Sequence, residues 1–534
     1  MKSLLMHRDR DFDANGSLRD VMYGHRGARR EQELRLPDHE QLIQDLELDV
    51  LFRAMSGDDK FLFEVARKAV LSGVQNDPDS IRYRQQALKD CLNNREVVRK
   101  LYAITVDATT GTRKLQWESS TYQYPTSLLL YAIDLLEALS GKLREVREIA
   151  EKSAQRFESE AFRTLLAMLQ NELTDDYLAK ISGHLSDLRF RKGMLLSAEL
   201  DEHNDATNYT LRRRAKGEPK WLDRLLGKRP ATYTFYIAER DQAGGEILTQ
   251  MRRRGISRAA VALAQSGEHV LRFFTMLRTE LAFYLGCLNL HPTLVNEGSA
   301  LCFPVLVEAG RGSERFRRLY DICLALHTRG SVVANTTDAA GKRLVLITGA
   351  NQGGKSTFLR SVGVAQLMMQ AGMFVGAEEF AAELRPALFT HYKREEDASM
   401  KSGKLDEELA RMSDIANRIV PNAMVLFNES FAATNEREGS EIARQIVSAL
   451  LEKHVRVVYV THLVTFARTF WERDRERALF LRAERNPDGV RTYRMIEGEP
   501  LETSYGADLY LQVFEASGQE SSGEGNHAQA IVDA

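Results

Sequence analysis

The chain has 534 residues, of which 43% are hydrophobic and 28% are charged, and its formal net charge is −2. This length predicts two to four domains, and the near-neutral charge excludes a globally basic nucleic-acid-binding protein, so any contact with nucleic acid must come from local basic patches. The four cysteines form no C-x-x-C pair, no signal-peptide core opens the chain and no apolar stretch is long enough for a bilayer, so we expect a cytoplasmic protein with no zinc site, no disulfide framework and no membrane partner.

The first 330 residues are predicted to be mainly helical. Residues 1–36 are polar and rich in Arg, which favours a flexible, solvated N-terminal arm over an arm that touches an acidic partner. In residues 37–330 apolar side chains recur at helical spacing, as in long amphipathic helices that pack on each other. A short strand is expected at residues 233–237, where the pattern alternates.

Residues 211–230 interrupt this helical pattern with the strongest basic patch in the chain. Lys and Arg residues surround Trp221 there. Such a segment either contacts nucleic-acid phosphates or forms a solvated loop, and the sequence leaves both readings open. The candidate DNA-binding residues are Arg212, Arg213, Arg214, Lys216, Lys220, Lys228 and Arg229.

From residue 331 to 515 the pattern becomes α/β. Apolar segments with strand character are separated by segments with helical periodicity, which predicts a largely parallel sheet. The tail at 516–534 is rich in Ser, Gly and Glu and is expected to be disordered. The predicted strands cover residues 343–348, 423–427, 455–460, 478–482 and 491–496.

The segment 349–356 reads G-A-N-Q-G-G-K-S and matches the phosphate-binding pattern G-x-x-x-x-G-K-[ST]. A strand-like run precedes it and a helix-like run follows, so backbone N–H groups and a helix N-terminus can surround phosphates. Lys355 is expected to reach the β- and γ-phosphates and Ser356 to ligate Mg²⁺; a glycine-rich turn without a ligand is the alternative. The predicted nucleotide-binding residues are Gly349, Ala350, Asn351, Gln352, Gly353, Gly354, Lys355, Ser356 and Thr357.

Two later strands deliver polar residues to the same edge of the sheet. The strand at 423–427 ends in Asn428 and Glu429, where ATPases usually have an Asp-Glu pair that holds Mg²⁺ and orients the attacking water. Asn428 can ligate through oxygen but brings no charge, so we expect weaker Mg²⁺ binding and slow hydrolysis. The strand at 455–460 leads to His462, which either contacts the γ-phosphate or is structural.

These motifs together resemble the MutS family of ATPases. The family's T-G-P-N-M-G-G-K-S-T loop is similar to residues 348–357, and its L-x-D-E strand and A-T-H motif resemble residues 426–429 and 460–462. Its G-T-S-T-x-D-G loop is similar to residues 433–439, and an S-Y-G near its dimerising end is similar to residues 504–506.

The resemblance implies an α+β multidomain protein. A mostly helical, MutS-like core and lever domain would occupy residues 37–330, with the basic insert near 211–230 as a remnant of the family's DNA clamp. A P-loop, ABC-like α/β ATPase domain with C-terminal dimerisation helices would occupy residues 331–515.

The chain also departs from the family's pattern. It leaves no room for the family's N-terminal mismatch-recognition domain or for the nuclease domain of another branch, so mismatch reading is not expected. Val332 stands where the family has an aromatic residue that stacks on adenine, which implies a weaker hold on the base. The family's trans-acting Ser has no clear match, and Ser402 is the candidate for that role.

The sequence therefore predicts an ATP- and Mg²⁺-dependent switch. Two protomers would form a homodimeric clamp on DNA, mainly through contacts with the DNA backbone, in repair or recombination and together with repair-protein partners. In this reading Lys355 and the loop hold the phosphates, Ser356 and Asn428 support Mg²⁺, Glu429 positions water and His462 senses the γ-phosphate. The alternatives are a switch that acts on a protein or ribonucleoprotein partner, and a nucleotide-binding module with little turnover. The DNA structure and the pathway are left open.

Overall fold

The protein divides into two compact units, one formed by Met1–Arg19 with Asn93–Leu281 and the other by Asp20–Leu92 with Ala282–Ala534. This division joins an early helical segment to the nucleotide module, whereas the sequence analysis placed a boundary near residue 330. The computed structural model describes residues 1–13, 18, 37–75, 77–117, 124–191, 193–203, 205–213, 233–296, 299–308, 314–394, 403–486 and 490–500.

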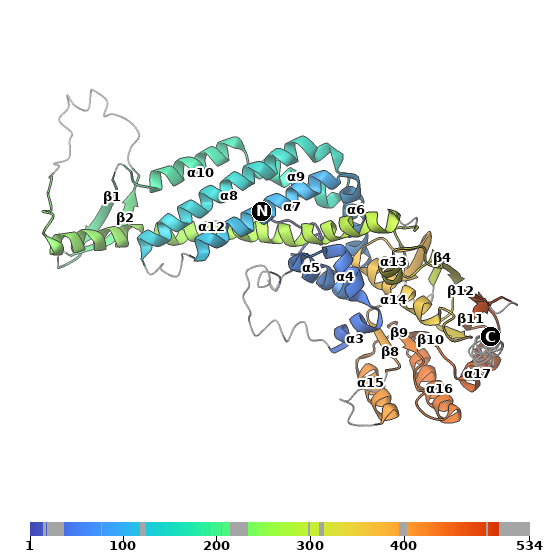
Figure 1. The fold of residues 1–534 in the computed structure, drawn as a ribbon. Coiled ribbons are helices and arrows are strands. Elements are labelled where there is room, and N and C mark those ends of the chain that lie inside the picture. The colour runs from blue at the N-terminus through green and yellow to red at the C-terminus, as the bar shows by residue number, and fades with distance from the viewer. Residues whose placement is uncertain are drawn as a thin grey trace, which may run out of the picture. The chain divides into compact units, whose positions relative to one another are not determined.

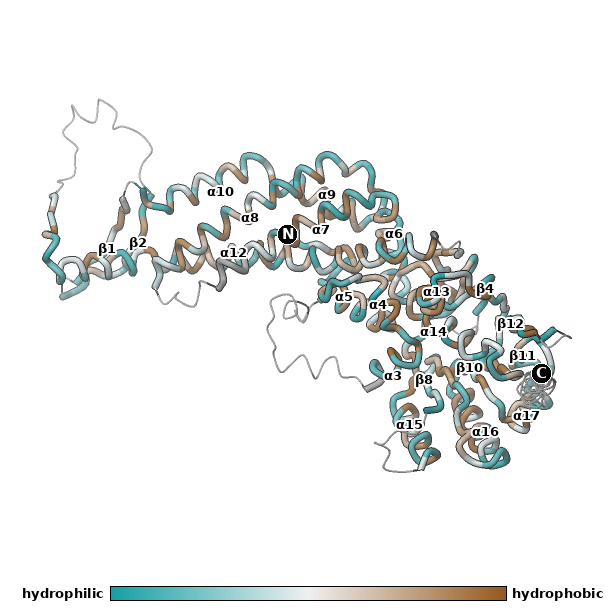
Figure 2. The backbone as a smooth tube through the Cα atoms, in the orientation of Figure 1, coloured by the Kyte–Doolittle hydropathy of each residue, from teal (hydrophilic) through white to brown (hydrophobic). Residues whose placement is uncertain are grey.

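The first unit is built mainly from long helices (Figure 1). Local capping sets where they begin: the Ser159 and Thr174 hydroxyls accept hydrogen bonds from backbone N–H groups of the first turns of α9 and α10. Apolar and polar residues alternate along these helices (Figure 2), and the apolar side chains form the core of the unit. The helices are α7 (Arg95–Trp117), α8 (Pro125–Ser153), α9 (Glu160–Glu172), α10 (Asp175–Leu188) and α12 (Gln242–Asn296), the last of which continues into the second unit.

Residues 1–13 pack into this first unit, which differs from the solvated arm expected for 1–36. Leu5 and Met6 are fully buried. The Leu5 N–H donates to a carboxylate oxygen of Glu280 at 2.7 Å, and burial raises the pKa of Glu280 to about 7. The apolar pair offsets the cost of ordering the polar terminus, which composition alone did not reveal. Residues 14–17 and 19–36 lie outside the described part of the chain.

A two-stranded antiparallel hairpin, β1 (Leu195–Leu200) and β2 (Ala206–Arg212), also belongs to the first unit. It was not predicted. The Leu196 side chain lies so close to Gly255 of α12 that a β-carbon there would come within 2.4 Å of it. Glycine at this point of the helix therefore permits the hairpin to pack on α12.

The strand predicted at residues 233–237 is wrong. The segment has no regular structure, and the side chains of Tyr233, Phe235 and Tyr236 are 80%, 88% and 86% exposed. Alternation favours a strand only where a sheet edge receives it, and within the described residues β1 pairs with β2 alone.

The core of the second unit is a six-stranded sheet in the order β12-β11-β6-β10-β9-β8. Every neighbouring pair is parallel except β11 with β12, which confirms the predicted, largely parallel sheet. Near-continuous apolar runs suit strands that are buried on both faces. The strands are β6 (Leu344–Thr348), β8 (Leu388–Tyr392), β9 (Met424–Asn428), β10 (Arg456–Val460), β11 (Ala478–Arg485) and β12 (Arg491–Glu497), of which β8 was not predicted.

A second sheet of four strands, in the order β3-β7-β4-β5, was not predicted at all. A buried ion pair between Arg456 of β10 and Glu314 of β4, with N···O 2.5 Å, ties it to the larger sheet. Its strands are short and three of them carry charged residues, so their patterns give weak signals. They are β3 (Val305–Val307), β4 (Glu314–Leu319), β5 (Asn335–Asp338) and β7 (Glu379–Glu383).

Helices complete the second unit. The Asp77 carboxylate accepts from the Ser80 N–H at 2.8 Å and caps the start of α6. Among the described residues no helix is both long and apolar enough to cross a membrane. The helices are α3 (Pro37–Asp45), α4 (Leu48–Ser56), α5 (Lys60–Leu71), α6 (Pro78–Asn93), α13 (Ile322–Thr328), α14 (Lys355–Ala371), α15 (Lys404–Arg418), α16 (Glu436–Glu452) and α17 (Val464–Asp474).

Candidate functional site

The glycine-rich loop connects β6, a strand inside the sheet, to the N-terminus of α14. Gly349 and Gly354 have φ values of +112° and +86°, which residues other than glycine rarely adopt. A β-carbon at Gly353 would come within 2.7 Å of the Ala483 β-carbon on β11. These glycines are therefore required both for the path of the loop and for its close approach to β11.

Lys355, the first residue of α14, is buried and folded back onto the loop. Its ammonium donates to the carbonyl oxygens of Gly349 at 2.9 Å and Ala350 at 2.8 Å. Burial lowers the pKa of Lys355 to about 8, and the nearby Glu429 carboxylate opposes that shift. The site thus holds a partly desolvated cation beside several loop N–H groups, which favours binding of an anion.

Ser356 and Asn428 meet at the end of β9. The Ser356 hydroxyl donates to the Asn428 side-chain oxygen at 3.0 Å. Within the described residues no group of three or more His, Cys, Asp or Glu side chains could hold a metal ion. A cation at this position would accordingly depend on the neutral oxygens of Ser356 and Asn428, on water and on the phosphates of a nucleotide.

Glu429 and His462 form a pair beside this point. The Glu429 carboxylate accepts a hydrogen bond from His462 Nε2 at 3.0 Å, and the Glu429 N–H donates to the Val460 carbonyl. The hydrogen bond from His462 and the charges of Lys355 and Lys393 lower the pKa of Glu429, and burial opposes this shift. Glu429 is thus ionised at neutral pH and able to accept a proton or orient a water molecule.

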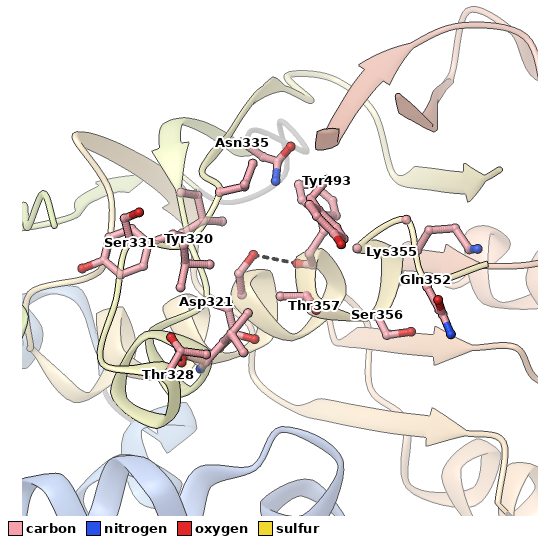
Figure 3. A pocket seen from close by; sticks show the side chains of 18 of the residues that line it. Tyr320, Asp321, Thr328, Ser331, Asn335, Gln352, Lys355, Ser356, Thr357 and Tyr493 are labelled. Atoms are coloured by element: carbon pink, nitrogen blue, oxygen red, sulfur yellow. Dashed lines mark hydrogen bonds between the residues drawn. The ribbon is translucent and has the colours of Figure 1, made fainter. Parts of the chain in front are cut away.

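Lys355, Ser356 and Glu429 line a cavity of about 480 Å³ (Figure 3), whereas Asn428 and His462 are not among its lining residues. Its lining includes Lys355, Ser356 and Glu429 at one part and Val332 at another. The volume lies within the range of small-molecule sites. The structure therefore brings Lys355, Ser356 and Glu429 to one cavity, and Asn428 and His462 are joined to it by their hydrogen bonds to Ser356 and Glu429.

The cavity also contains residues that the sequence analysis did not single out. Tyr493 of β12, Tyr320 and Asn335 also line it, and Figure 3 shows Tyr493 beside the start of α14. The Asn335 side chain accepts from the Met495 N–H at 2.7 Å and so holds β12 at the cavity. Nothing in the local pattern around Tyr493 marks it, because its position depends on the pairing of β12 with β11.

A further contact joins β12 to the loop. Arg491 donates to the side-chain oxygen of Gln352 at 2.7 Å, and Gln352 itself has a φ of +58°. The hairpin of β11 and β12 thus touches the loop through Ala483, Arg491 and Tyr493. This contact fixes the loop from the side opposite to β10.

The predicted basic segment is only partly within the described residues. Arg212 ends β2 and donates to the Ser197 hydroxyl, and Arg213 pairs with Asp187 at 3.2 Å. Exposed Arg252, Arg254 and Arg258 lie around Gly255 of α12, where the hairpin packs. Of the remaining candidates, Arg214, Lys216, Lys220, Lys228 and Arg229 lie outside the described part of the chain, as do Ser402 and residues 504–506.

A strand inside a parallel sheet that leads through a G-x-x-x-x-G-K-S sequence into a helix defines the class of α/β nucleotide-binding domains. The family comparisons agree with this class. A model of the MutS2 N-terminal domain matches residues 76–297, and a model of MutS domain V matches residues 345–517. The chain belongs to the MutS family.

Individual relatives are similar over parts of the chain. The DNA mismatch repair protein MutS of Thermus aquaticus is 30% identical over 181 residues, which are 34% of this chain and 22% of that protein. MutS protein homolog 4 of Mus musculus is 28% identical over 205 residues, 36% of this chain and 20% of that protein. Endonuclease MutS2 of Thermus thermophilus is 31% identical over 121 residues, 23% and 16% respectively. The matched part spans about a fifth of the length of these relatives.

Proposed function

We propose that this chain is an ATPase of the MutS type that binds ATP and Mg²⁺ and acts as a nucleotide-dependent switch on DNA. The observation that carries the proposal is one cavity beside the glycine-rich loop that is lined by Lys355, Ser356 and Glu429, the last two hydrogen-bonded to Asn428 and His462 respectively. Phosphoryl transfer requires positioned phosphates, a metal ion and an oriented water, and these residue types can supply each of them.

Each residue has a distinct role in this proposal. Lys355 releases its bonds to the loop carbonyls and donates to the β- and γ-phosphates. The N–H groups of residues 349–357 surround the phosphates, Glu429 orients water, and His462, bonded to Glu429, responds to the γ-phosphate. Val332 and Tyr493 border the part of the cavity that would receive the base.

The residues present fit a Mg²⁺ ion that has few protein ligands and keeps several of its water ligands. Ser356 and Asn428 would hold it, and it would neutralise charge on the phosphates when bound. Because neither ligand is charged, the chain contributes less to Mg²⁺ affinity than an Asp would. The cation should therefore bind together with ATP.

Asn428→Asp is expected to lower the Mg²⁺ concentration for half-maximal hydrolysis several-fold and to raise the maximal rate. The new carboxylate would accept from the Ser356 hydroxyl in the same geometry and would add a negative charge. The measurement is a Mg²⁺ titration of phosphate release. Asn417→Asp, on the exposed end of α15, is the matched control for the change in charge. An unchanged Mg²⁺ dependence in Asn428→Asp would place the metal elsewhere.

Tyr493→Ala is expected to weaken ATP binding about tenfold, because a base stacked on an aromatic ring loses roughly 1–3 kcal/mol when the ring is removed. Tyr493→Phe keeps the ring and should retain the affinity. Fluorescence titration with a labelled ATP analogue and with labelled inorganic triphosphate separates the affinity that comes from the base from the affinity that comes from the phosphates. Equal losses for ATP and triphosphate would show that Tyr493 holds the loop and not the base.

We propose DNA as the macromolecular ligand, in repair or recombination. The support is the family membership, the similarity to a DNA mismatch repair protein and the arginines on β2 and α12. We propose that the chain forms a homodimer in which Ser402 completes the partner's site. The dimer would contact mainly the phosphates of the DNA and would not read mismatches. Repair proteins are the further partners expected, and the site of action is cytoplasmic.

Two other functions are kept as outcomes of the test. The near-neutral chain, with net charge −2, favours a switch that acts on a protein or ribonucleoprotein. Asn428 favours a nucleotide-binding module with little turnover.

The test is binding of the full chain to labelled homoduplex, mismatched and branched DNA, with and without ATP, at two salt concentrations. Phosphate contacts predict affinity that falls steeply with salt, and a switch predicts that ATP changes it. A well-folded chain that binds ATP but none of the DNA substrates would overturn the DNA part of the proposal and leave the ATPase part standing.

A further inference from the structure

A buried polar cluster lies directly behind the Glu429–His462 pair. It surrounds Ser430, which is fully buried between Glu429 and Phe431. Both neighbours have positive φ values, 55° for Glu429 and 62° for Phe431, although neither is glycine. Such a conformation persists only when the surrounding structure holds it.

The side chain of Ser430 is held by β8. Its hydroxyl lies 2.7 Å from His391 Nδ1, and His391 Nε2 lies 2.9 Å from the Glu408 carbonyl oxygen on α15. Because a carbonyl can only accept, Nε2 carries the proton. The Ser430 hydroxyl has a single proton and lies within hydrogen-bond distance of both the His391 carbonyl oxygen, at 2.5 Å, and the unprotonated Nδ1. Burial lowers the pKa of His391 to about 4, so the ring is neutral in this arrangement.

The backbone on both sides of Ser430 is held as well. The Glu408 carboxylate accepts from the Phe431 N–H at 2.7 Å, and the Tyr459 hydroxyl donates to the Ser430 carbonyl at 2.8 Å. The His391 ring stacks on Phe431, with centroids 5.2 Å apart. Glu408 is 4% exposed, and burial raises its pKa. A buried carboxylate is costly unless it is hydrogen-bonded, so the bond to the Phe431 N–H holds Glu408 and Phe431 in one relative position.

We infer that Glu408, His391 and Ser430 are positioning residues that fix the Glu429 carboxylate for hydrolysis and make its orientation depend on the position of α15. The inference rests on the proposed ATPase function and deepens it. Both bonds from Glu408 come from the second turn of α15, so a shift of this helix moves the two residues that follow Glu429. Helix α15 begins at Lys404 with Gly403 as its N-cap, so a partner that docks on this end of the helix would act on Glu429 through Glu408.

The test compares Glu408→Ala with Glu408→Gln in the full chain. We expect Glu408→Ala to lower kcat for ATP hydrolysis at least tenfold and to leave the Kd for ATP within threefold, because the loop and Lys355 are untouched. Glu408→Gln should restore most of the rate, since its amide oxygen can accept from the Phe431 N–H. Asp406→Ala, at an exposed position on the first turn of α15, is the matched control and should have the parental kcat.

Ser430→Ala is the second variant, because it removes one hydroxyl without changing the shape of the core. It should lower kcat several-fold with unchanged ATP affinity. A parental kcat in both Glu408→Ala and Ser430→Ala, or an equal loss in Glu408→Gln and Glu408→Ala, would overturn the inference. If the parental protein binds ATP but does not hydrolyse it, the proposed ATPase function is overturned, and this inference is overturned with it.

Discussion

Replacing Glu429 with Gln is expected to lower the rate of ATP hydrolysis by about a hundred- to a thousandfold and to leave ATP binding nearly unchanged. Glutamine keeps the shape of the side chain and can still accept from His462, but it cannot take a proton or orient water as a carboxylate does. The ionised state of Glu429 is secured by His462, Lys355 and Lys393, so the full effect should be present at neutral pH. Single-turnover hydrolysis and equilibrium ATP binding measure the two quantities separately.

The matched control for this change is Glu452→Gln, on the exposed end of α16, which should hydrolyse ATP like the parent. ATP should also remain bound to Glu429→Gln for longer than to the parent. Parental turnover in Glu429→Gln would show that this residue takes no part in hydrolysis. Loss of ATP binding would show that its role is to bind ATP and not to promote the reaction.

Replacing Lys355 with Met is expected to weaken ATP binding by at least a hundredfold and to abolish measurable turnover. The side chain is buried, and methionine fills a similar volume without charge, so the fold should be retained. The phosphates would lose their nearest cation in a site from which water is largely excluded, where one donor is worth about 10²–10³ in rate. Calorimetric titration with ATP and with ADP measures the loss.

The pH dependence of binding gives a second test of Lys355. With a pKa of about 8 in the free protein, its ammonium is present below pH 8 and is lost as pH rises above 8. ATP favours the charged form, so affinity should be greatest below pH 8 and should fall above it by at most about tenfold per pH unit. Lys355→Met should lack this dependence between pH 7 and 9.5, and Lys453→Met, at an exposed position, should keep it. A parental profile that is flat through this range would contradict the role of Lys355.

Much of the second unit could be predicted from sequence because its signals are local. The strands β6, β9, β10 and β11 are unbroken apolar runs, each near a turn or polar residue, and the glycine-rich loop requires particular residue types at a fixed spacing. The placement of Lys355, Ser356, Asn428 and Glu429 at one edge of the sheet follows from parallel pairing. Their roles in hydrolysis remain predictions until the variants are measured.

The positions of other site residues could not be predicted, because distant segments decide them. Tyr493 reaches the cavity through the antiparallel pairing of β12, and Asn335 reaches β12 from a strand of the other sheet. The small sheet was not predicted because its strands are short and most of them carry charged residues. The strand expected at 233–237 does not form because, in the part of the chain that the structure describes, no sheet edge pairs with it.

The sequence by itself determined the family and the chemistry of the loop, since glycine, lysine and serine at these spacings are required by backbone conformation and phosphate binding. Only the tertiary structure decided the environment of that chemistry. The burial that lowers the pKa of Lys355, the His462 hydrogen bond to Glu429 and the Glu408–His391–Ser430 cluster all join segments from different strands and helices. Hydrogen bonding and desolvation depend on these spatial neighbours, and the order of residues along the chain does not specify them.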